Sequence, residues 1–373
     1  MKINFFAPIN QLGYGIHAYN TIKSFEARGH EAFLIPPRLK TEFTDEAVER
    51  WRAKAKSEFS PNNPSVMIFH EEYLTQFSGS PRVGFPVFEM DQFTPEQLMG
   101  MRSCDHLFTP SAWGKEVLRQ NGFENVSVVN EGFDPELFPF VSKSNSETQG
   151  SAFTFIHVGK AEERKGTLQT VRCFVQALEK KDARLILHID NPFSSVELMK
   201  IIHFLRSRGF KGYGNLGLNN ENGTIYRNQG LCVDLRSFSE DASVIAESFA
   251  EADCGIFPSR AEGWGLPILE CLASGVPAIA GQWTAMGEYL LSDPYTLSQP
   301  NPIPAYDGTW FFGDRGNWFA VKDEELTSKI ILAYETARDY RRLEAWKSNV
   351  NDYRKFTWAR SAEQLEKALG SLV

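Results

Sequence analysis

The chain has 373 residues, of which 42% are apolar and 23% charged, and its formal net charge is −8. This length predicts two domains rather than one core, and the acidic balance argues against an extended nucleic-acid footprint. The N-terminus lacks the pattern of a signal peptide and no apolar run reaches membrane-spanning length, so we expect neither a leader nor a membrane span. Five cysteines without C-x-x-C spacing predict buried free thiols in a reducing cytoplasm and no zinc site.

The first half alternates strand-length apolar runs with helical patterns, which predicts an α/β unit with a parallel sheet. Between its first two strands, Gly13, Gly15 and Ala18 fit G-x-G-x-x-[G/A], the pattern of a dinucleotide-binding turn. A dinucleotide site needs an acidic residue after the second strand to hold the ribose, but Pro-Pro-Arg (36–38) stands there. A nicotinamide dehydrogenase is therefore disfavoured. The strands expected in this half are 2–7, 31–35, 65–69, 83–88, 106–109 and 126–129.

The basic cluster ERWRAKAK (49–56) allows two interpretations. It could bind anionic lipid or nucleic acid with Trp51 inserted, or it could belong to a helix that begins at Thr44. Acidic residues in the first turn and lysines near the end suit the helix dipole. Val48, Trp51 and Ala55 have the spacing of a core-facing stripe, and we favour the helix.

A polar, serine-rich stretch, VSKSNSETQGS (141–151), has no periodicity and predicts an interdomain linker. After it a second α/β unit begins. Two such units leave a cleft between them, and in open α/β sheets ligands bind beyond the carboxyl ends of the strands. The strands expected in this half are 153–159, 184–189, 231–235, 253–257 and 276–280.

Cations crowd the loop that follows the strand 153–159. Lys160, Arg164 and Lys165 precede Gly166, which opens an amphipathic helix. Cations beside a helix N-terminus can form an anion site for a diphosphate, although as surface charge these side chains would be unremarkable.

The segment 252–280 contains a buried strand, the loop SRAEGWG and a helix with Pro267 at its first position and Gly275 at its end. Glu262 lies on the loop and Glu270 in the first turns of the helix. Each carboxylate can accept hydrogen bonds from neighbouring hydroxyls of a ligand. The alternative from spacing alone is that both are solvated surface glutamates.

Together these segments resemble the retaining nucleotide-sugar glycosyltransferases of the GT-B fold, most closely family 4. The family's E-x7-E motif matches Glu262 and Glu270, and its G-[RK]-x4-K-G loop matches residues 159–166. Weaker similarities run through the chain: LGYGIHAYN (12–20), ARGHEAFLI (27–35), FPVFEMD (85–91), FTPSAWGKEVL (108–118), VVNEGFDPELF (128–138) and FTWARSAEQLEKAL (356–369).

The resemblance implies a fold of two Rossmann-like α/β domains that face each other across a cleft. Residues 1–140 would form the acceptor-binding domain, 141–151 the linker, and 152–350 the nucleotide-sugar domain. Residues 351–373 would form a helix that returns to the N-terminal domain.

The resemblance also implies roles for residues of the donor site. Glu270 would hold the ribose hydroxyls and Glu262 the hydroxyls of the donor sugar. Lys160 and Lys165, with Arg164 in the same loop, would neutralise the leaving diphosphate in place of a metal ion. No Asp-x-Asp motif occurs, and we expect no cofactor and no metal.

The same resemblance implies that main-chain groups of both domains contact the donor across the cleft. Gly13 and Gly15 would let the main chain approach the diphosphate from the N-terminal domain. Main-chain N–H groups in the opposite loop would help to bind the sugar, in the residues Gly263, Trp264, Gly265 and Leu266.

The acceptor would lie on the N-terminal domain. His70 corresponds to a histidine that the family places near the reacting carbon, though a histidine at a strand end is often structural. Glu89 and Asp91 fall on another segment expected to line the cleft, where many relatives have histidine, so the acceptor type stays open. We nominate no protein nucleophile, because in such enzymes the leaving phosphate can take the acceptor's proton on the same face.

The resulting hypothesis is a cytoplasmic, metal-independent, retaining glycosyltransferase that uses a UDP-, GDP- or ADP-sugar. The alternatives are a GT-B sugar-nucleotide epimerase and a sugar-nucleotide-binding protein without catalysis. A glycan, a lipid-linked or a small-molecule acceptor would fit. Nucleic acid is disfavoured by charge but stays open, and membrane contact would be peripheral at most.

Overall fold

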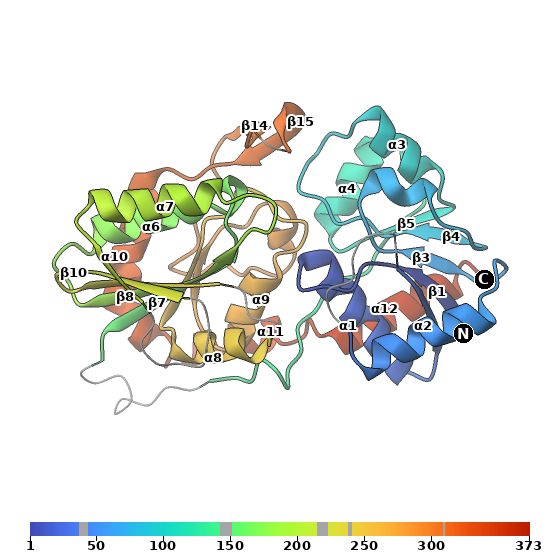
Figure 1. The fold of residues 1–373 in the computed structure, drawn as a ribbon, viewed down its shortest axis with the longest axis horizontal. Helices are drawn as coiled ribbons and strands as arrows, with labels where there is room; N and C mark the ends of the chain where they lie inside the picture. Colours follow the sequence, from blue (N-terminus) through green and yellow to red (C-terminus); the bar gives the residue numbers. More distant parts are fainter. Residues whose placement is uncertain (37–43, 142–150, 215–222, 238–240, 309) are drawn as a thin grey trace.

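The computed structural model describes residues 1–36, 44–141, 151–214, 223–237, 241–308 and 310–373. The chain forms two main sheets with helices on both faces, and a separate two-stranded hairpin (Figure 1). No helix in these ranges is long and apolar enough to cross a membrane. Most of the predicted linker 141–151, and residues 37 and 38 after the second strand, lie outside the described residues.

The first sheet is entirely parallel, as predicted, with the order β2-β1-β3-β4-β5-β6. Two of its strands, β3 and β4, end at least two residues earlier than expected. After β4 the chain reaches Pro86, which has no N–H to donate, and after β3 it turns into a 3₁₀ helix, Glu71–Thr75. The strands are β1 Lys2–Phe6, β2 Glu31–Ile35, β3 Ser65–Met67, β4 Arg82–Gly84, β5 His106–Thr109 and β6 Val126–Val128.

Helices cover both faces of this sheet (Figure 1). The basic cluster belongs to a helix, as favoured, but Asp45 rather than Thr44 caps it by accepting a hydrogen bond from the Val48 N–H at 2.8 Å. Trp51 is fully buried in the core, so it cannot insert into a membrane or nucleic acid. The helices are α1 Gly13–Ala27, α2 Glu46–Glu58, α3 Pro95–Arg102 and α4 Ala112–Gln120.

The second sheet has the order β13-β12-β7-β8-β11-β10-β9. The sheet is parallel, as predicted, except at one edge, where β10 runs antiparallel to both of its neighbours, β9 and β11. The strands β9 and β10 lie in a stretch rich in Gly and Asn that lacks apolar alternation, so the sequence pattern did not reveal them. The strands are β7 Phe153–Lys160, β8 Ala183–Asp190, β9 Lys211–Gly214, β10 Gly223–Asn228, β11 Leu231–Arg236, β12 Cys254–Phe257 and β13 Ala278–Ala280.

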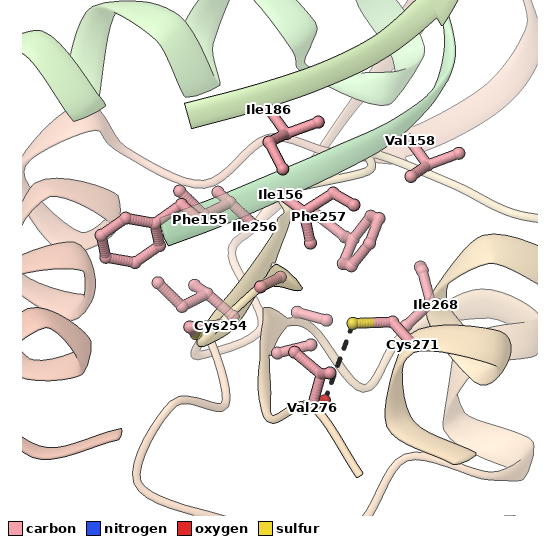
Figure 2. Close-up of a cluster of buried hydrophobic side chains, with 14 of the residues drawn as sticks. Phe155, Ile156, Val158, Ile186, Cys254, Ile256, Phe257, Ile268, Cys271 and Val276 are labelled. Atoms are coloured by element: carbon pink, nitrogen blue, oxygen red, sulfur yellow. Dashed lines mark hydrogen bonds between the residues drawn. The ribbon is translucent and has the colours of Figure 1, made fainter. Parts of the chain in front are cut away.

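The core of the second half lies between this sheet and its helices. Figure 2 shows Phe155, Ile156 and Ile256 of the central strands in this core, and Cys271 near Ile268, with its thiol 3.7 Å from the Val276 carbonyl oxygen. All five cysteines are free, as predicted, and three of them are buried. The helices are α6 Thr167–Ala177, α7 Val196–Ser207, α8 Ser243–Glu251, α9 Leu266–Ala273, α10 Asp323–Tyr340 and α11 Glu344–Tyr353.

The C-terminal helix α12 (Trp358–Gly370) crosses back to the first half, as predicted (Figure 1). Its buried stripe of Ala362, Leu365 and Leu369 belongs to the same core as β1 and α1. Just before the helix, the Phe133 N–H donates to the Phe356 carbonyl at 3.0 Å.

A second connection is the hairpin of β14 (Pro302–Tyr306) and β15 (Phe312–Phe319), which the sequence did not predict. Its inner face packs Ala305, Phe311 and Trp318 into a cluster with Phe88 and Met90 of the first half. The two halves are therefore joined both by α12 and by this hairpin.

We predict that Leu365→Ala lowers the free energy of unfolding by about 2–5 kcal/mol, because it leaves a cavity where α12 meets the first half. Leu343, which is 52% exposed, provides a matched control, and Leu343→Ala should change stability by less than about 0.5 kcal/mol. Urea denaturation of both variants measures the difference. Equal midpoints would show that the docking of α12 does not stabilise the fold.

Candidate active site

Each sheet has one point at which its strand order reverses, and the predicted motifs lie at these points. In the second sheet β7 has β8 on one side and β12 on the other, so the loops after β7 and β12 leave the same edge in opposite directions. In the first sheet β1 stands between β2 and β3 in the same way. Ligands of open α/β sheets bind at such switch points.

The loop after β7 turns sharply into α6. Gly166, with φ of +68°, caps the helix in the left-handed conformation that favours glycine. A Cβ atom there would lie 2.9 Å from Pro258 Cγ and 3.0 Å from the Pro258 carbonyl oxygen. Glycine therefore lets the loop after β7 approach the loop after β12, and the loop places Arg164 and Lys165 over the edge of the sheet.

Three charged side chains from these two loops form a buried cluster. The Lys165 Nζ atom lies 2.7 and 2.8 Å from the two carboxylate oxygens of Glu262, and Arg164 Nη1 lies 3.1 Å from one of them. Arg164 also donates to the Ala261 carbonyl at 2.7 Å and to Glu162 at 2.6 Å. The sequence predicted Lys165, Arg164 and Glu262 as site residues, and the fold brings them into contact.

The cations determine the charge state of Glu262. Burial on its own raises the pKa of this carboxyl, but Lys165 and Arg164 outweigh burial and lower the pKa to about 2. Glu262 is therefore ionised at neutral pH. A lysine ammonium has three N–H donors, so Lys165 can hold both oxygens of Glu262 and still donate to a third oxygen.

Lys160 does not join Lys165 on Glu262. Its Nζ atom lies 3.7 Å from Glu162 and 5.8 Å from the centre of the Phe193 ring. The expectation that both lysines serve one diphosphate therefore remains a prediction, with Lys160 at the periphery of the cluster.

The cluster extends to the first half through Arg164. Its Nη2 atom lies 3.2 Å from Glu89, whose backbone carbonyl accepts a hydrogen bond from the Trp318 indole at 2.8 Å. Asp91 accepts from the Asn317 N–H at 3.0 Å. Both carboxylates of the FEMD segment thus face the second half, and Glu89 completes the cluster from the opposite wall.

The loop after β12 approaches the first half closely. At Gly263 a Cβ atom would lie 2.5 Å from Val87 Cγ1, so only glycine fits. Gly265 has φ of +97° and caps α9, in which Pro267 takes the second position rather than the predicted first. Among the described residues none accepts a hydrogen bond from the N–H groups of Gly263, Trp264 or Gly265.

Aromatic packing holds this loop in place. Trp264 is 1% exposed and contacts Tyr289 and Phe356, with ring centres 5.2 and 5.8 Å apart. The Tyr289 hydroxyl donates to the carbonyls of Trp264 and Gly265, each at 3.1 Å. The side chain of Trp264 is thus structural, and the predicted contact with a ligand concerns its main chain only.

Glu270 lies on α9, which begins at Leu266. Burial raises the pKa of its carboxyl to about 8. In the described part of the chain its carboxylate has no hydrogen-bond or ion-pair partner, in contrast to Glu262. The two glutamates of the motif therefore differ in charge at neutral pH.

At the switch point of the first sheet, His70 follows β3 and lies against Tyr14 of α1, with ring centres 4.7 Å apart. Loss of solvent around the ring lowers the pKa of His70, and so does Lys160, while Glu72 and Glu89 raise it. His70 is thus electrostatically coupled to both walls of the interface.

Gly13 and Gly15 lie in the first turn of α1 rather than in a loop before it. A Cβ atom at Gly15 would lie 2.3 Å from the Asn10 carbonyl oxygen, whereas at Gly13 nothing lies within 4 Å. Packing thus accounts for Gly15, and Gly13 alone has open space beside its main chain.

A buried pair that the sequence did not suggest joins two segments of the first half, α1 and the loop after β6. His17 Nδ1 of α1 is 3.4 Å from a carboxylate oxygen of Glu131, and both side chains are almost fully buried. The His17 ring stacks on Trp358 and meets Phe85 edge to face. Burial lowers the pKa of His17 to about 3, so the imidazole is neutral.

Glu131 also belongs to the electrostatics of the site. Burial raises the pKa of Glu131, and the carboxylates of Glu89, Glu262 and Glu270 raise it further. The segment VVNEGFDPELF carries part of the family resemblance, but a glutamate in a loop has no spacing that reveals its burial. Only the fold shows that this carboxyl faces the others.

Comparisons with known proteins follow the same segments. The model of a family described as "Family 4 Glycosyltransferase in conflict systems" matches residues 113–365. A GDP-mannose-dependent alpha-(1-6)-phosphatidylinositol dimannoside mannosyltransferase of Mycobacterium tuberculosis is 33% identical over 73 residues. That match spans 20% of this chain and 19% of the mannosyltransferase.

Solved structures are similar over the whole chain. Sucrose-phosphate synthase from Thermosynechococcus elongatus superposes with a TM-score of 0.68 at 14% identity, covering 100% of this chain and 99% of that one. HepE from Anabaena, solved in complex with UDP and glucose, gives 0.63 at 14% identity and covers 100% of both chains. At these identities the likeness concerns the fold.

We predict that Gly15→Ala lowers the free energy of unfolding by about 1–3 kcal/mol, because the new methyl group overlaps Asn10. Gly13→Ala is the matched control, and it should leave stability unchanged or higher, because alanine favours a helix over glycine. If the main chain of Gly13 approaches a ligand, Gly13→Ala should also lower the affinity for the nucleotide-sugar, although its stability is kept. Thermal melting and calorimetry separate the two effects, and equal melting points would contradict the packing argument.

We predict that donor affinity increases as the pH rises toward 8, by up to about tenfold per pH unit, because only ionised Glu270 can accept from both ribose hydroxyls. Calorimetry across this range should show that Glu270→Gln removes the increase, while Glu344→Gln on the surface keeps it. The stability of the unliganded protein should change in the opposite direction. Because the folded state raises the pKa of Glu270, the free energy of unfolding falls as the pH rises from 4.5 to about 8. A pH-independent affinity in wild type would contradict the role of Glu270.

Proposed function

The chain belongs to the family 4 glycosyltransferases of conflict systems and has the GT-B fold, and from this we propose that it is a retaining, metal-independent enzyme. It would move a sugar from a UDP-, GDP- or ADP-sugar to an acceptor hydroxyl. The observation that carries the proposal is the buried contact of Lys165 and Arg164 with Glu262 at the switch point of the second sheet. The E-x7-E and lysine-loop motifs supply these groups.

The donor would bind at the edge of the second sheet. Glu270 would accept hydrogen bonds from the ribose hydroxyls, and Glu262 from the hydroxyls of the sugar. The free N–H groups at the start of α6 and in the loop Gly263–Gly265 point to the same anionic and hydroxylated ligand. Gly13 would let the main chain of α1 approach from the first half.

Lys165 would stabilise the leaving group. As the bond between the anomeric carbon and the phosphate oxygen breaks, negative charge grows on the diphosphate, and the third N–H of Lys165 can meet it. Because Lys165 and Arg164 are already held by Glu262, little reorganisation is needed when that charge develops. This is the work that a divalent metal does in other sugar transferases.

Retention follows from attack on the face that the leaving group occupies. The acceptor oxygen bonds to the anomeric carbon, the carbon–phosphate-oxygen bond breaks, and the acceptor proton passes to the departing phosphate oxygen. This balance needs no protein nucleophile. His70 and Glu89 would line the acceptor side, where they are coupled electrostatically to each other.

We predict that Lys165→Ala lowers kcat by about 10²–10³-fold, because it removes a preorganised charge from the leaving group. Lys347→Ala is the control, since this lysine pairs with Glu344 on the surface. Radiolabelled UDP-, GDP- and ADP-sugars are incubated with and without acceptor pools, and thermal melting verifies that the variants fold. An unchanged kcat in a folded Lys165→Ala protein would show that Lys165 does not stabilise the leaving group.

The same assay tests the remaining features of the proposal. Turnover that EDTA abolishes and Mg²⁺ or Mn²⁺ restores would overturn metal independence. A donor that is epimerised without acceptor would favour the epimerase, and binding without any turnover would favour the inactive binding protein. The anomeric configuration of the product tests retention.

A further inference from the structure

The outer face of the hairpin β14–β15 carries exposed aromatic side chains. Tyr306 and Phe312 stand opposite each other on the two strands, and Trp310 lies in the turn between them. Trp310 meets a fourth ring, Phe193, edge to face with centres 6.4 Å apart. The exposed fractions of these four residues are 56–61%. We call Phe193, Tyr306, Trp310 and Phe312 the aromatic rim.

The hairpin holds these rings on a fixed support. Its inner face is buried against the first half, and the Asp307 carboxylate accepts hydrogen bonds from the N–H groups of Trp310 and Phe311 at 2.8 and 2.9 Å. The rim is therefore presented on a hairpin whose other face is packed. Contiguous exposed apolar surface on a well-packed element is typical of an interaction site.

The aromatic rim borders the candidate active site. Phe193 follows β8 at the carboxyl edge of the sheet, and Lys160 of the loop after β7 lies 5.8 Å from its ring centre. On the inner face of the hairpin, Trp318 donates to the main chain of Glu89. In Figure 1 the hairpin lies where the two halves meet.

The charges of the hairpin select among possible ligands. From Tyr306 to Gly316 there are two carboxylates, Asp307 and Asp314, and one cation, Arg315. Lys160 beside Phe193 adds a second cation, so the charges around the rim balance. Nucleic acid and anionic membranes bind through an excess of cations, which this balanced set does not provide. A neutral, hydroxyl-rich ligand needs no such excess.

We propose that the aromatic rim binds sugar rings of a neutral oligosaccharide, which is the acceptor of the reaction proposed above. The apolar C–H face of a sugar can cover the electron-rich face of an aromatic ring, and its hydroxyls can donate to carboxylates such as Asp314. This inference rests on the proposed function, because it names the acceptor class for the same site. The rim would bind units of the chain beyond the one that reacts.

Calorimetry with three neutral oligosaccharides, maltoheptaose, mannohexaose and chitohexaose, tests the rim. Wild type should bind at least one at millimolar concentration. Trp310→Ala and Phe193→Ala should each weaken that binding about tenfold, which corresponds to about 1.4 kcal/mol. Met99→Ala is the control, because Met99 is 61% exposed on α3 of the first half and should leave binding unchanged. Donor binding should be unchanged in Trp310→Ala and in Met99→Ala, and Phe193→Ala is left out of this comparison because Phe193 lies beside Lys160.

Parallel titrations use vesicles of phosphatidylcholine with phosphatidylglycerol and a mixed-sequence single-stranded DNA. The proposal is overturned if no oligosaccharide binds, if the rim variants bind as wild type does, or if only vesicles or DNA bind in a rim-dependent way. Donor binding separates this test from the proposed function. If the wild type binds a nucleotide-sugar but no oligosaccharide, only the proposal for the rim is wrong. If the wild type binds no nucleotide-sugar, the proposed function is wrong.

Discussion

The buried contact of Glu262 with Lys165 and Arg164 is the interaction on which the rest of the site depends. A buried carboxylate without partners would be neutral or strongly destabilising, so its position requires both cations. The cations come from the loop after β7 and the carboxylate from the loop after β12, and these strands are neighbours. Parallel pairing therefore assembles the cluster, and Gly166 permits the close approach of the two loops.

The same constraint connects the two halves. Arg164 has more donors than Glu262 can accept, and one of them reaches Glu89 of the first half. Around this contact the surfaces are tightly packed, since Gly263 has no room for a side chain against Val87. The interface is thus specified by one charged contact and by steric fit. The donor of the proposed reaction would enter among groups that already contact one another.

Two structural connections support this interface from opposite ends. The helix α12 adds its apolar stripe to the core of the first half, and the hairpin β14–β15 covers the segment that carries Glu89 and Asp91. The buried pair of His17 and Glu131 lies on the side of α12, because His17 stacks on Trp358. Residues for both proposed substrates are therefore positioned by elements that belong to both halves.

The sequence by itself determined the α/β class, the strands of both sheets that carry the motifs, and the residues of the charged cluster. Apolar runs of strand length, the capped helix patterns and the spacing of Glu262 and Glu270 are local signals, so they are readable without a fold. The segment FTWARSAEQLEKAL carried part of the family resemblance, which implied that α12 returns to the first half.

Only the tertiary structure decided which of these groups touch. The ion pair of Arg164 with Glu89 and the burial of Glu131 depend on residues far apart in the chain. So do the different partners of the two lysines, because Lys160 lies beside Phe193 and Lys165 binds Glu262. The hairpin was missed because its prolines and glycines break the alternation of a strand. The physical reason is common to all of these: local patterns specify elements, whereas desolvation and contact between loops arise only when the elements pack together.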